Sequence, residues 1–277
     1  MKFLGAKHKG DIKIIGVPLD ATVSYRPGTR FAYSEVVKAS VAIETYSPYL
    51  ELDLEDFDFE DMGQVELPFG NVEKSFGIIE GIVRELSAFP FLAIGGEHLI
   101  TYPILKVLKD RFEDLVVLHL DAHLDMRDEY LGERLSHATV MRRVAELGIS
   151  ILSMGVRSFI REEIQFVKSS EVVEISPFKF DIGLLERLKG RNVYISFDSD
   201  VLDPSYLPGV GTPEPNGVSI GDVIDLIVSL SKLDLKIVGI DFVEVNPMID
   251  STGNTPIIAS FIVRELLLLL AKNYYSR

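Results

Sequence analysis

Short apolar segments alternate along this chain with longer stretches that have helical periodicity. Five stretches place apolar residues on one helical face: Val72–Leu86, Tyr102–Arg111, Ala138–Leu147, Gly221–Leu233 and Thr255–Ala271. Six segments have the length of a strand and are rich in Val, Ile, Leu or Phe: Ile12–Val17, Phe91–Ile94, Leu115–Leu120, Ile151–Met154, Asn192–Phe197 and Lys236–Ile240. These six lack regular polar alternation, which is typical of strands that are covered on both faces.

This alternation predicts an α/β fold, namely a three-layer αβα sandwich with a mostly parallel central sheet. A length of 277 residues suits one α/β domain, so we expect residues 1–277 to form a single domain. Ser219 and Asp222 predict a capping box at the start of a helix. Proline and glycine concentrate in the segments 18–28 and 204–217, and the second is long enough to predict a functional loop.

The charge and composition narrow the range of partners. Lys and Arg number 28 against 42 Asp and Glu, so the net charge of −14 argues against nucleic acid and anionic membranes. The same charge is compatible with a cationic substrate or with bound metal ions. Cysteine is absent, which excludes disulfides, thiolate zinc sites and a cysteine nucleophile.

Neither end of the sequence indicates a membrane segment. Phe3–Ala6 is too short for the apolar core of a secretory signal. The apolar stretch Ile257–Ala271 is interrupted by Arg264 and Glu265, and it falls short of the roughly 18–20 apolar residues that a span needs. We therefore expect a soluble, cytoplasmic protein.

Ligand-type side chains directly follow three of the predicted strands. Alternate residues of an extended chain point to one side, and the carboxyl ends of parallel strands meet at one edge of a sheet. Gly95 and Gly96 allow a tight turn before a histidine at that edge. The side chains expected to converge there are His98, Asp121, His123, Asp125, Asp198 and Asp200.

Four carboxylates and two imidazoles exceed the needs of one tetrahedral zinc site and suit a pair of divalent ions. Oxygen-rich ligation without thiolate favours Mn²⁺. Two such ions, roughly 3.5–4 Å apart, can activate a bridging water as hydroxide at neutral pH. The alternative is a solvated acidic strand end. That alternative is less convincing because the pattern occurs twice in one chain.

Six motifs in order carry a resemblance to a known family. They are IGGEH at 94–98, DAHLD at 121–125, SHATVMRR at 136–143, SFDSDVLDP at 196–204, GTPEPNG at 211–217 and IDFVEVNP at 240–247. With them the chain resembles the ureohydrolases, the family of the arginases and agmatinases, and most closely the agmatinases. The resemblance spans nearly the whole chain and implies a fold of the arginase–deacetylase type. It also implies a homo-oligomer, either a trimer or a hexamer.

The resemblance also implies roles for individual residues. One Mn²⁺ would be held by His98, Asp121, Asp125 and Asp198, and the second by Asp121, His123, Asp198 and Asp200. His137 would shuttle protons, and Glu214 would grip the guanidinium of the substrate. Where the family often has Gly and Asp, this chain has Ala138 and Glu97, and neither difference removes an expected ligand.

The implied reaction is the hydrolysis of agmatine, a small cationic guanidino compound, to urea and putrescine by a metal-bridging hydroxide. The segment Met126–His137 lacks the Asn with which arginases typically read the amino-acid end of arginine, so agmatine ranks first. N1-aminopropylagmatine and arginine remain alternatives. A mononuclear zinc deacetylase and a non-catalytic metal- or polyamine-binding protein are less favoured.

Four polar residues near the predicted edge of the sheet receive other interpretations. His119 is read equally as a residue that supports the metal ligands and as a core histidine. Asp203, Asp241 and Glu244 are read as supporting or structural acids rather than as metal ligands.

Overall fold

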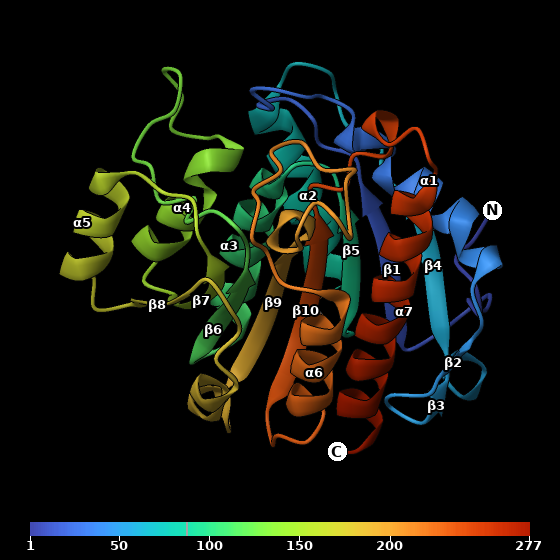
Figure 1. Cartoon of the computed structure of the whole chain (residues 1–277). Coiled ribbons are helices and arrows are strands. Elements are labelled where there is room, and N and C mark those ends of the chain that lie inside the picture. Colours follow the sequence, from blue (N-terminus) through green and yellow to red (C-terminus); the bar gives the residue numbers. More distant parts are fainter. Residues whose placement is uncertain (87) are drawn as a thin grey trace.

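A parallel sheet of eight strands forms the centre of the protein (Figure 1). The computed structural model describes residues 1–86 and 88–277. All seven pairings between neighbouring strands are parallel, which confirms the predicted central sheet. Across the sheet the order is β4 (Phe59–Gln64), β1 (Ile12–Val17), β5 (Phe91–Gly95), β10 (Lys236–Val243), β9 (Asn192–Asp198), β6 (Leu115–Leu120), β7 (Ser150–Val156) and β8 (Val173–Pro177).

Helices cover both faces of this sheet and complete the predicted three-layer sandwich (Figure 1). One apolar core lies between the sheet and α1 (Ala32–Ala39), α6 (Ile220–Leu230) and α7 (Asn254–Tyr275). A second core lies between the opposite face and α2 (Val72–Leu86), α3 (Thr101–Arg111), α4 (Val140–Glu146) and α5 (Arg161–Ser169). The predicted capping box begins α6, where Ser219 Oγ accepts the backbone N–H of Asp222 and the Asp222 carboxylate accepts that of Ser219.

The sequence pattern predicted the interior of the sheet better than its edges. β1, β6 and α2 have the predicted bounds, and the other predicted strands and helices are present with ends shifted by a few residues. The two outermost strands, β4 and β8, were not predicted. An outermost strand has only one neighbour, and both have exposed or half-buried positions that dilute the apolar signal. The short helices α1 and α5 and the small hairpin of β2 (Tyr46–Ser47) and β3 (Leu52–Asp53) were also missed.

The register of the central strands brings four strand ends together. Gly95 of β5 pairs with Val17 of β1, and Ile94 pairs with Phe242 of β10. Val243 of β10 pairs with Asp198 of β9. Since β6 lies on the other side of β9, the carboxyl ends of β5, β10, β9 and β6 are consecutive along one edge. The loops that leave these ends gather at the top of Figure 1.

The C-terminal helix α7 is a core element. It is the one helix in the described part of the chain that is long and apolar enough to cross a membrane by length and composition. However, 72% of its most apolar 18-residue window is buried inside the fold. The five consecutive leucines, 266 to 270, are each at most 1% exposed and pack in the core shared with α1 and α6. The apolar character of α7 is therefore explained by packing against the sheet.

We predict that Leu268→Ala lowers the free energy of unfolding by about 2–5 kcal/mol, because it removes a fully buried side chain and leaves a cavity. Ile257→Ala on the same helix is the matched control. Its side chain is 41% exposed, so we expect a change within about 0.5 kcal/mol. Urea denaturation of both variants measures the difference. Equal effects would contradict the assignment of Leu268 to the core.

Candidate functional site

His98 lies at the centre of a cluster of aspartates. It begins a short 3-10 helix (His98–Ile100) directly after β5. Its Nδ1 atom lies 3.2, 3.1 and 3.2 Å from a carboxylate oxygen of Asp121, Asp125 and Asp198, respectively. This nitrogen is buried and has no well-aligned hydrogen-bond partner among the described residues. A buried imidazole nitrogen that faces three carboxylate oxygens is a suitable donor set for a divalent cation.

A second group of ligand-type atoms adjoins the first and shares Asp121 with it. His123 Nδ1 lies 3.0 Å from Asp200 Oδ2 and 3.5 Å from Asp121 Oδ1. Asp121, His123 and Asp200 lie close enough together to hold one ion. The structure thus brings all six predicted metal ligands into two neighbouring groups at the carboxyl ends of β5, β6 and β9.

The backbone reaches this arrangement differently from the prediction. An extended chain was expected to carry the ligands beyond β6 and β9, and this expectation is wrong on both segments, whereas a tight turn was expected before His98. Asp125 adopts a left-handed conformation with φ of 51°. Asp200 lies in a 3-10 turn (Ser199–Val201), whose start is capped by the Asp198 side chain accepting the Asp200 N–H at 2.8 Å. The side chains converge because the chain bends after each strand.

Burial makes the negative charges of this cluster costly. Burial raises the pKa of Asp198 well above its usual value, and repulsion from Asp200 and Asp121 adds to the effect. Burial also raises the pKa of Asp200. For Asp121, burial acts in the same direction, but the neighbouring histidines, His119 first among them, outweigh it and hold the pKa well below its usual value. A bound cation would relieve the repulsion among these carboxylates.

A buried network of hydroxyl groups orients His98. Asp241 accepts hydrogen bonds from the hydroxyls of Thr101 (2.7 Å), Tyr194 (2.8 Å) and Ser196 (2.8 Å). Because Ser196 donates its hydrogen to Asp241, its oxygen is left to accept from His98 Nε2, which lies 2.9 Å away. With its proton on Nε2, His98 presents a bare lone pair on Nδ1 to the aspartates. Asp241 was expected to have a supporting role, whereas Thr101, Tyr194 and Ser196 were missed.

His119 lies beside the cluster, close enough to His98 and Asp121 for the three to hold one ion, but both of its ring nitrogens are engaged by other groups. Its Nε2 lies 2.8 Å from Asp121 Oδ2 and its Nδ1 lies 2.9 Å from Ser153 Oγ. The side chain is fully buried. Because both ring nitrogens are engaged, His119 orients the carboxylate of Asp121, which decides between the two readings that the sequence left open.

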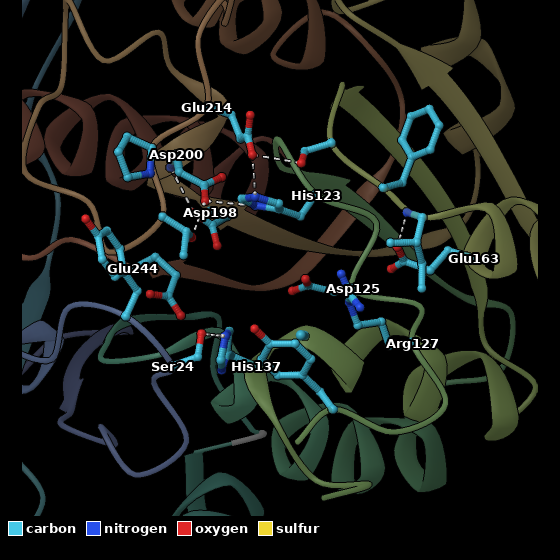
Figure 2. A pocket seen from close by; sticks show the side chains of 18 of the residues that line it. Ser24, His123, Asp125, Arg127, His137, Glu163, Asp198, Asp200, Glu214 and Glu244 are labelled. Atoms are coloured by element: carbon cyan, nitrogen blue, oxygen red, sulfur yellow. Dashed lines mark hydrogen bonds and ion pairs between the residues drawn. The ribbon is translucent and has the colours of Figure 1, made fainter. Parts of the chain in front are cut away.

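A cleft of about 560 Å³ opens beside the aspartate cluster (Figure 2). Both predicted catalytic residues, His137 and Glu214, line it together with His123, Asp125, Asp198 and Asp200. Further lining residues that sequence reasoning did not place in a site include Ser24, Tyr25, Tyr130, Ser158 and Glu163. Apart from Glu163, which lies in α5, they come from loops. Their contribution depends on the tertiary fold, so no local sequence signal marks them.

His137 lies at the wall of the cleft, in the 3-10 turn that precedes α4 (His137–Thr139). Burial lowers the pKa of His137 below its usual value. The neutral imidazole therefore predominates near pH 7, and it can take up a proton and release it again. In Figure 2 its ring lies beside Ser24 and faces the same opening as Asp125.

Two glutamates that line the cleft have different surroundings. Glu214 is one-third exposed, accepts a hydrogen bond from Ser158 Oγ at 2.8 Å and lies 3.6 Å from His123 Nε2. Glu244, which follows β10, is buried and accepts the backbone N–H of His98 at 2.7 Å. Burial raises the pKa of Glu244 well above its usual value. The side chain of Glu244 has no ion-pair partner within the described residues, so a cation in the cleft would supply one.

Known proteins match this chain over most of its length. The model of the arginase family matches residues 10–269. An agmatinase from Bacillus anthracis is 42% identical over 270 residues, which cover 94% of this chain and 92% of the relative. A guanidinobutyrase from Pseudomonas aeruginosa is 32% identical and covers 94% of this chain and 86% of its own length. The crystal structure of an agmatine ureohydrolase from Thermoplasma volcanium superposes with a TM-score of 0.86 at 32% identity, covering 100% of this chain and 96% of that one.

We predict that Ser196→Ala weakens Mn²⁺ binding by roughly 10–100-fold, because it removes the acceptor that keeps the proton on Nε2 of His98. Titration calorimetry of the purified protein with Mn²⁺ measures the affinity. Ser205→Ala is the control, since its exposed hydroxyl contacts Asp203 and not His98. Unchanged affinity in Ser196→Ala would show that the hydroxyl network does not tune the ligand.

Proposed function

This chain belongs to the arginase family, and from that premise we propose that it hydrolyses agmatine to urea and putrescine. It is a hydrolase that acts on guanidino C–N bonds. The observation that carries the proposal is the His/Asp cluster beside a cleft that is also lined by His137, Glu214 and Glu244. Agmatinases are prominent among the similar proteins, and this supports agmatine as the substrate.

We propose two Mn²⁺ ions as the metal content. His98, Asp121, Asp125 and Asp198 would hold one, and Asp121, His123, Asp198 and Asp200 the other. The oxygen-rich donor set and the partnerless Nδ1 of His98 fit such ions. When bound, the pair supplies a water of lowered pKa as the nucleophile. His98 and Asp200 both belong to the cluster, and this supports the two-ion site over the single zinc of a deacetylase.

His137 moves the proton that the reaction releases. A guanidinium is a poor electrophile, and its C–N bond breaks only when the leaving nitrogen is protonated. Neutral His137 can accept a proton and then deliver it to that nitrogen. Its place on the cleft wall, opposite the acidic cluster, puts it within reach of a substrate in the cleft (Figure 2).

The guanidinium needs a carboxylate that can accept two N–H groups side by side. Glu214 is the residue predicted from the sequence, but its oxygen is engaged by Ser158 at the partly exposed edge of the cleft. Glu244 is better placed, because it is buried beside His98 and has no cationic partner among the described residues. We therefore assign the guanidinium to Glu244 and place Glu214 nearer the cationic tail.

The proposal also covers the alternative substrates, the location and the assembly of the protein. N1-aminopropylagmatine and arginine are the alternative substrates. The guanidinobutyrase relative indicates that similar proteins act on guanidino compounds with other groups at the far end. We propose a cytoplasmic location. We also propose that residues 1–277 form a single catalytic domain and that the protein assembles as a trimer or hexamer.

The substrate assignment is tested by urea release from the Mn²⁺-loaded protein. We expect agmatine to be cleaved with the highest kcat/KM among agmatine, arginine, aminopropylagmatine, guanidinobutyrate and formiminoglutamate. The acidic cleft favours a cationic tail, and an anionic tail leaves a buried mismatch. A higher kcat/KM for arginine or guanidinobutyrate than for agmatine would overturn the assignment of agmatine as the substrate. Tight agmatine binding without urea release would instead indicate a binding protein.

The two glutamates can be separated by matched amide variants. We expect Glu244→Gln to lower kcat/KM for agmatine by roughly 10–100-fold, because charge-assisted hydrogen bonds contribute about 1.5–3 kcal/mol. Glu214→Gln should change kcat/KM by less and should alter the preference among tails. Metal analysis of both variants shows whether Mn²⁺ is retained. The reverse order of effects would return the guanidinium to Glu214.

A further inference from the structure

The loop at residues 18–28 follows β1 and forms part of the wall of the cleft. Its two ends are tied together, since Asp20 Oδ2 accepts the N–H of Gly28 at 2.9 Å and the Nε–H of Arg30 at 2.8 Å. The middle of the loop lies largely in solvent, with Ala21, Ser24 and Tyr25 exposed. A solvent-exposed segment keeps one conformation only where specific contacts hold it.

Glu97 provides such a contact at the middle of the loop. Its Oε2 atom accepts the backbone N–H groups of Ala21 at 3.1 Å and Thr22 at 2.8 Å. Glu97 is fully buried and immediately precedes the predicted ligand His98. The backbone also approaches closely here, because a Cβ atom on Gly96 would lie 1.8 Å from the carbonyl oxygen of Leu19. The turn that carries His98 thus also fixes the position of Thr22.

Thr22 in turn contacts His137 at two atoms. Its hydroxyl oxygen accepts the backbone N–H of His137 at 3.0 Å and lies 3.3 Å from Nδ1 of the ring. Ser136 Oγ lies 3.3 Å from the same Nδ1, and Ser24 Oγ lies 3.5 Å from Nε2. The Thr22 hydroxyl also donates its hydrogen toward the Glu97 carboxylate, so its oxygen is left to accept from Nδ1 as well as from the backbone N–H. This arrangement favours the neutral tautomer that carries its proton on Nδ1 and leaves the lone pair of Nε2 on the side of Ser24.

We propose that Thr22, held by Glu97, is a positioning residue that fixes the ring and the tautomer of His137. Held by the Thr22 hydroxyl, Nδ1 keeps the proton of the neutral ring, and Nε2 presents a free lone pair to the cleft. Nε2 can then take up a proton and deliver it to the leaving nitrogen. The catalytic part of this inference rests on the proposed function, whereas the tautomer of His137 does not. Thr22 itself is not a catalytic residue, because it acts only through His137.

The kinetic test compares Thr22→Val, which removes the hydroxyl at constant shape, with Thr22→Ser, which keeps it. We expect kcat for urea release to fall about tenfold in Thr22→Val, in keeping with the loss of one hydrogen bond. KM and Mn²⁺ content should stay within about twofold. Thr22→Ser should restore most of the rate. Thr252→Val is the control, because it removes an exposed hydroxyl that contacts Asp250.

A double variant tests whether Thr22 affects kcat through His137. If Thr22 acts through His137, adding Thr22→Val to His137→Ala should cause no further loss of kcat. A second tenfold loss in that background, or an unchanged kcat in Thr22→Val alone, would overturn the proposal. Glu97→Asp withdraws the carboxylate by one methylene and should lower kcat in wild type but not in Thr22→Val.

A third test does not depend on activity and observes the ring nitrogens of His137 directly. The chain has five histidines, so ¹⁵N-histidine NMR of the metal-free protein can resolve His137, with His137→Ala giving the assignment. We expect the neutral ring to carry its proton on Nδ1 in wild type and to populate both tautomers in Thr22→Val. The same tautomer in both proteins would refute the positioning role. Wild type that shows the expected tautomer but releases no urea would refute the proposed function alone.

Discussion

The structure depends on the need to neutralise four aspartates that are buried together at the edge of the sheet. Asp121, Asp125, Asp198 and Asp200 are each less than 10% exposed. An ionised carboxylate removed from water costs several kcal/mol unless a partner of opposite charge compensates it. Three of these carboxylates approach one nitrogen of His98. Burial, together with repulsion from Asp200 and Asp121, raises the pKa of Asp198. A fold that retains such a cluster is built around cations, and the surrounding hydroxyl and histidine contacts hold the ligands ready for them.

The parallel sheet brings these charges together. Consecutive parallel strands direct their carboxyl ends to one edge, and β5, β10, β9 and β6 are neighbours there. Each of the six predicted ligands lies within five residues of a strand end, so the strands rather than long loops set their positions. The cleft occurs where the loops diverge above this edge, which is the usual place for ligands in open α/β sheets. The acidic cluster and the cationic substrate are therefore consequences of the same architecture.

Much of the fold and of the candidate site could be predicted from the sequence because the signals are local. An apolar run that ends in Asp121 or Asp198 specifies both a buried strand and a ligand at its end. The sequence did not predict contacts between distant segments, such as the one between Thr22 and His137, which lie 115 positions apart. The edge strands β4 and β8 were missed because half-buried strands resemble loops in their polarity. Glu244 also follows an apolar strand, but it was read as a supporting or structural acid and not placed in the cleft. The role of Glu214 remains a prediction.

Local strain shows how tightly the parts of the site are held together. Asp125 and Glu244 adopt left-handed backbone conformations, with φ of 51° and 63°. Such conformations cost about 1–3 kcal/mol each in residues other than glycine and persist only where surrounding contacts over-determine them. Glu244 meets this condition, because its N–H donates to the Gly96 carbonyl at 2.9 Å and its carboxylate accepts the N–H of His98. The turn at residues 95–98 therefore has three roles. It holds the carboxylate of Glu244, which we assign to the guanidinium, and it presents the predicted metal ligand His98. Through Glu97 it also holds the loop beside His137. Since all three depend on one turn, a disturbance there should impair metal binding, substrate binding and proton transfer together.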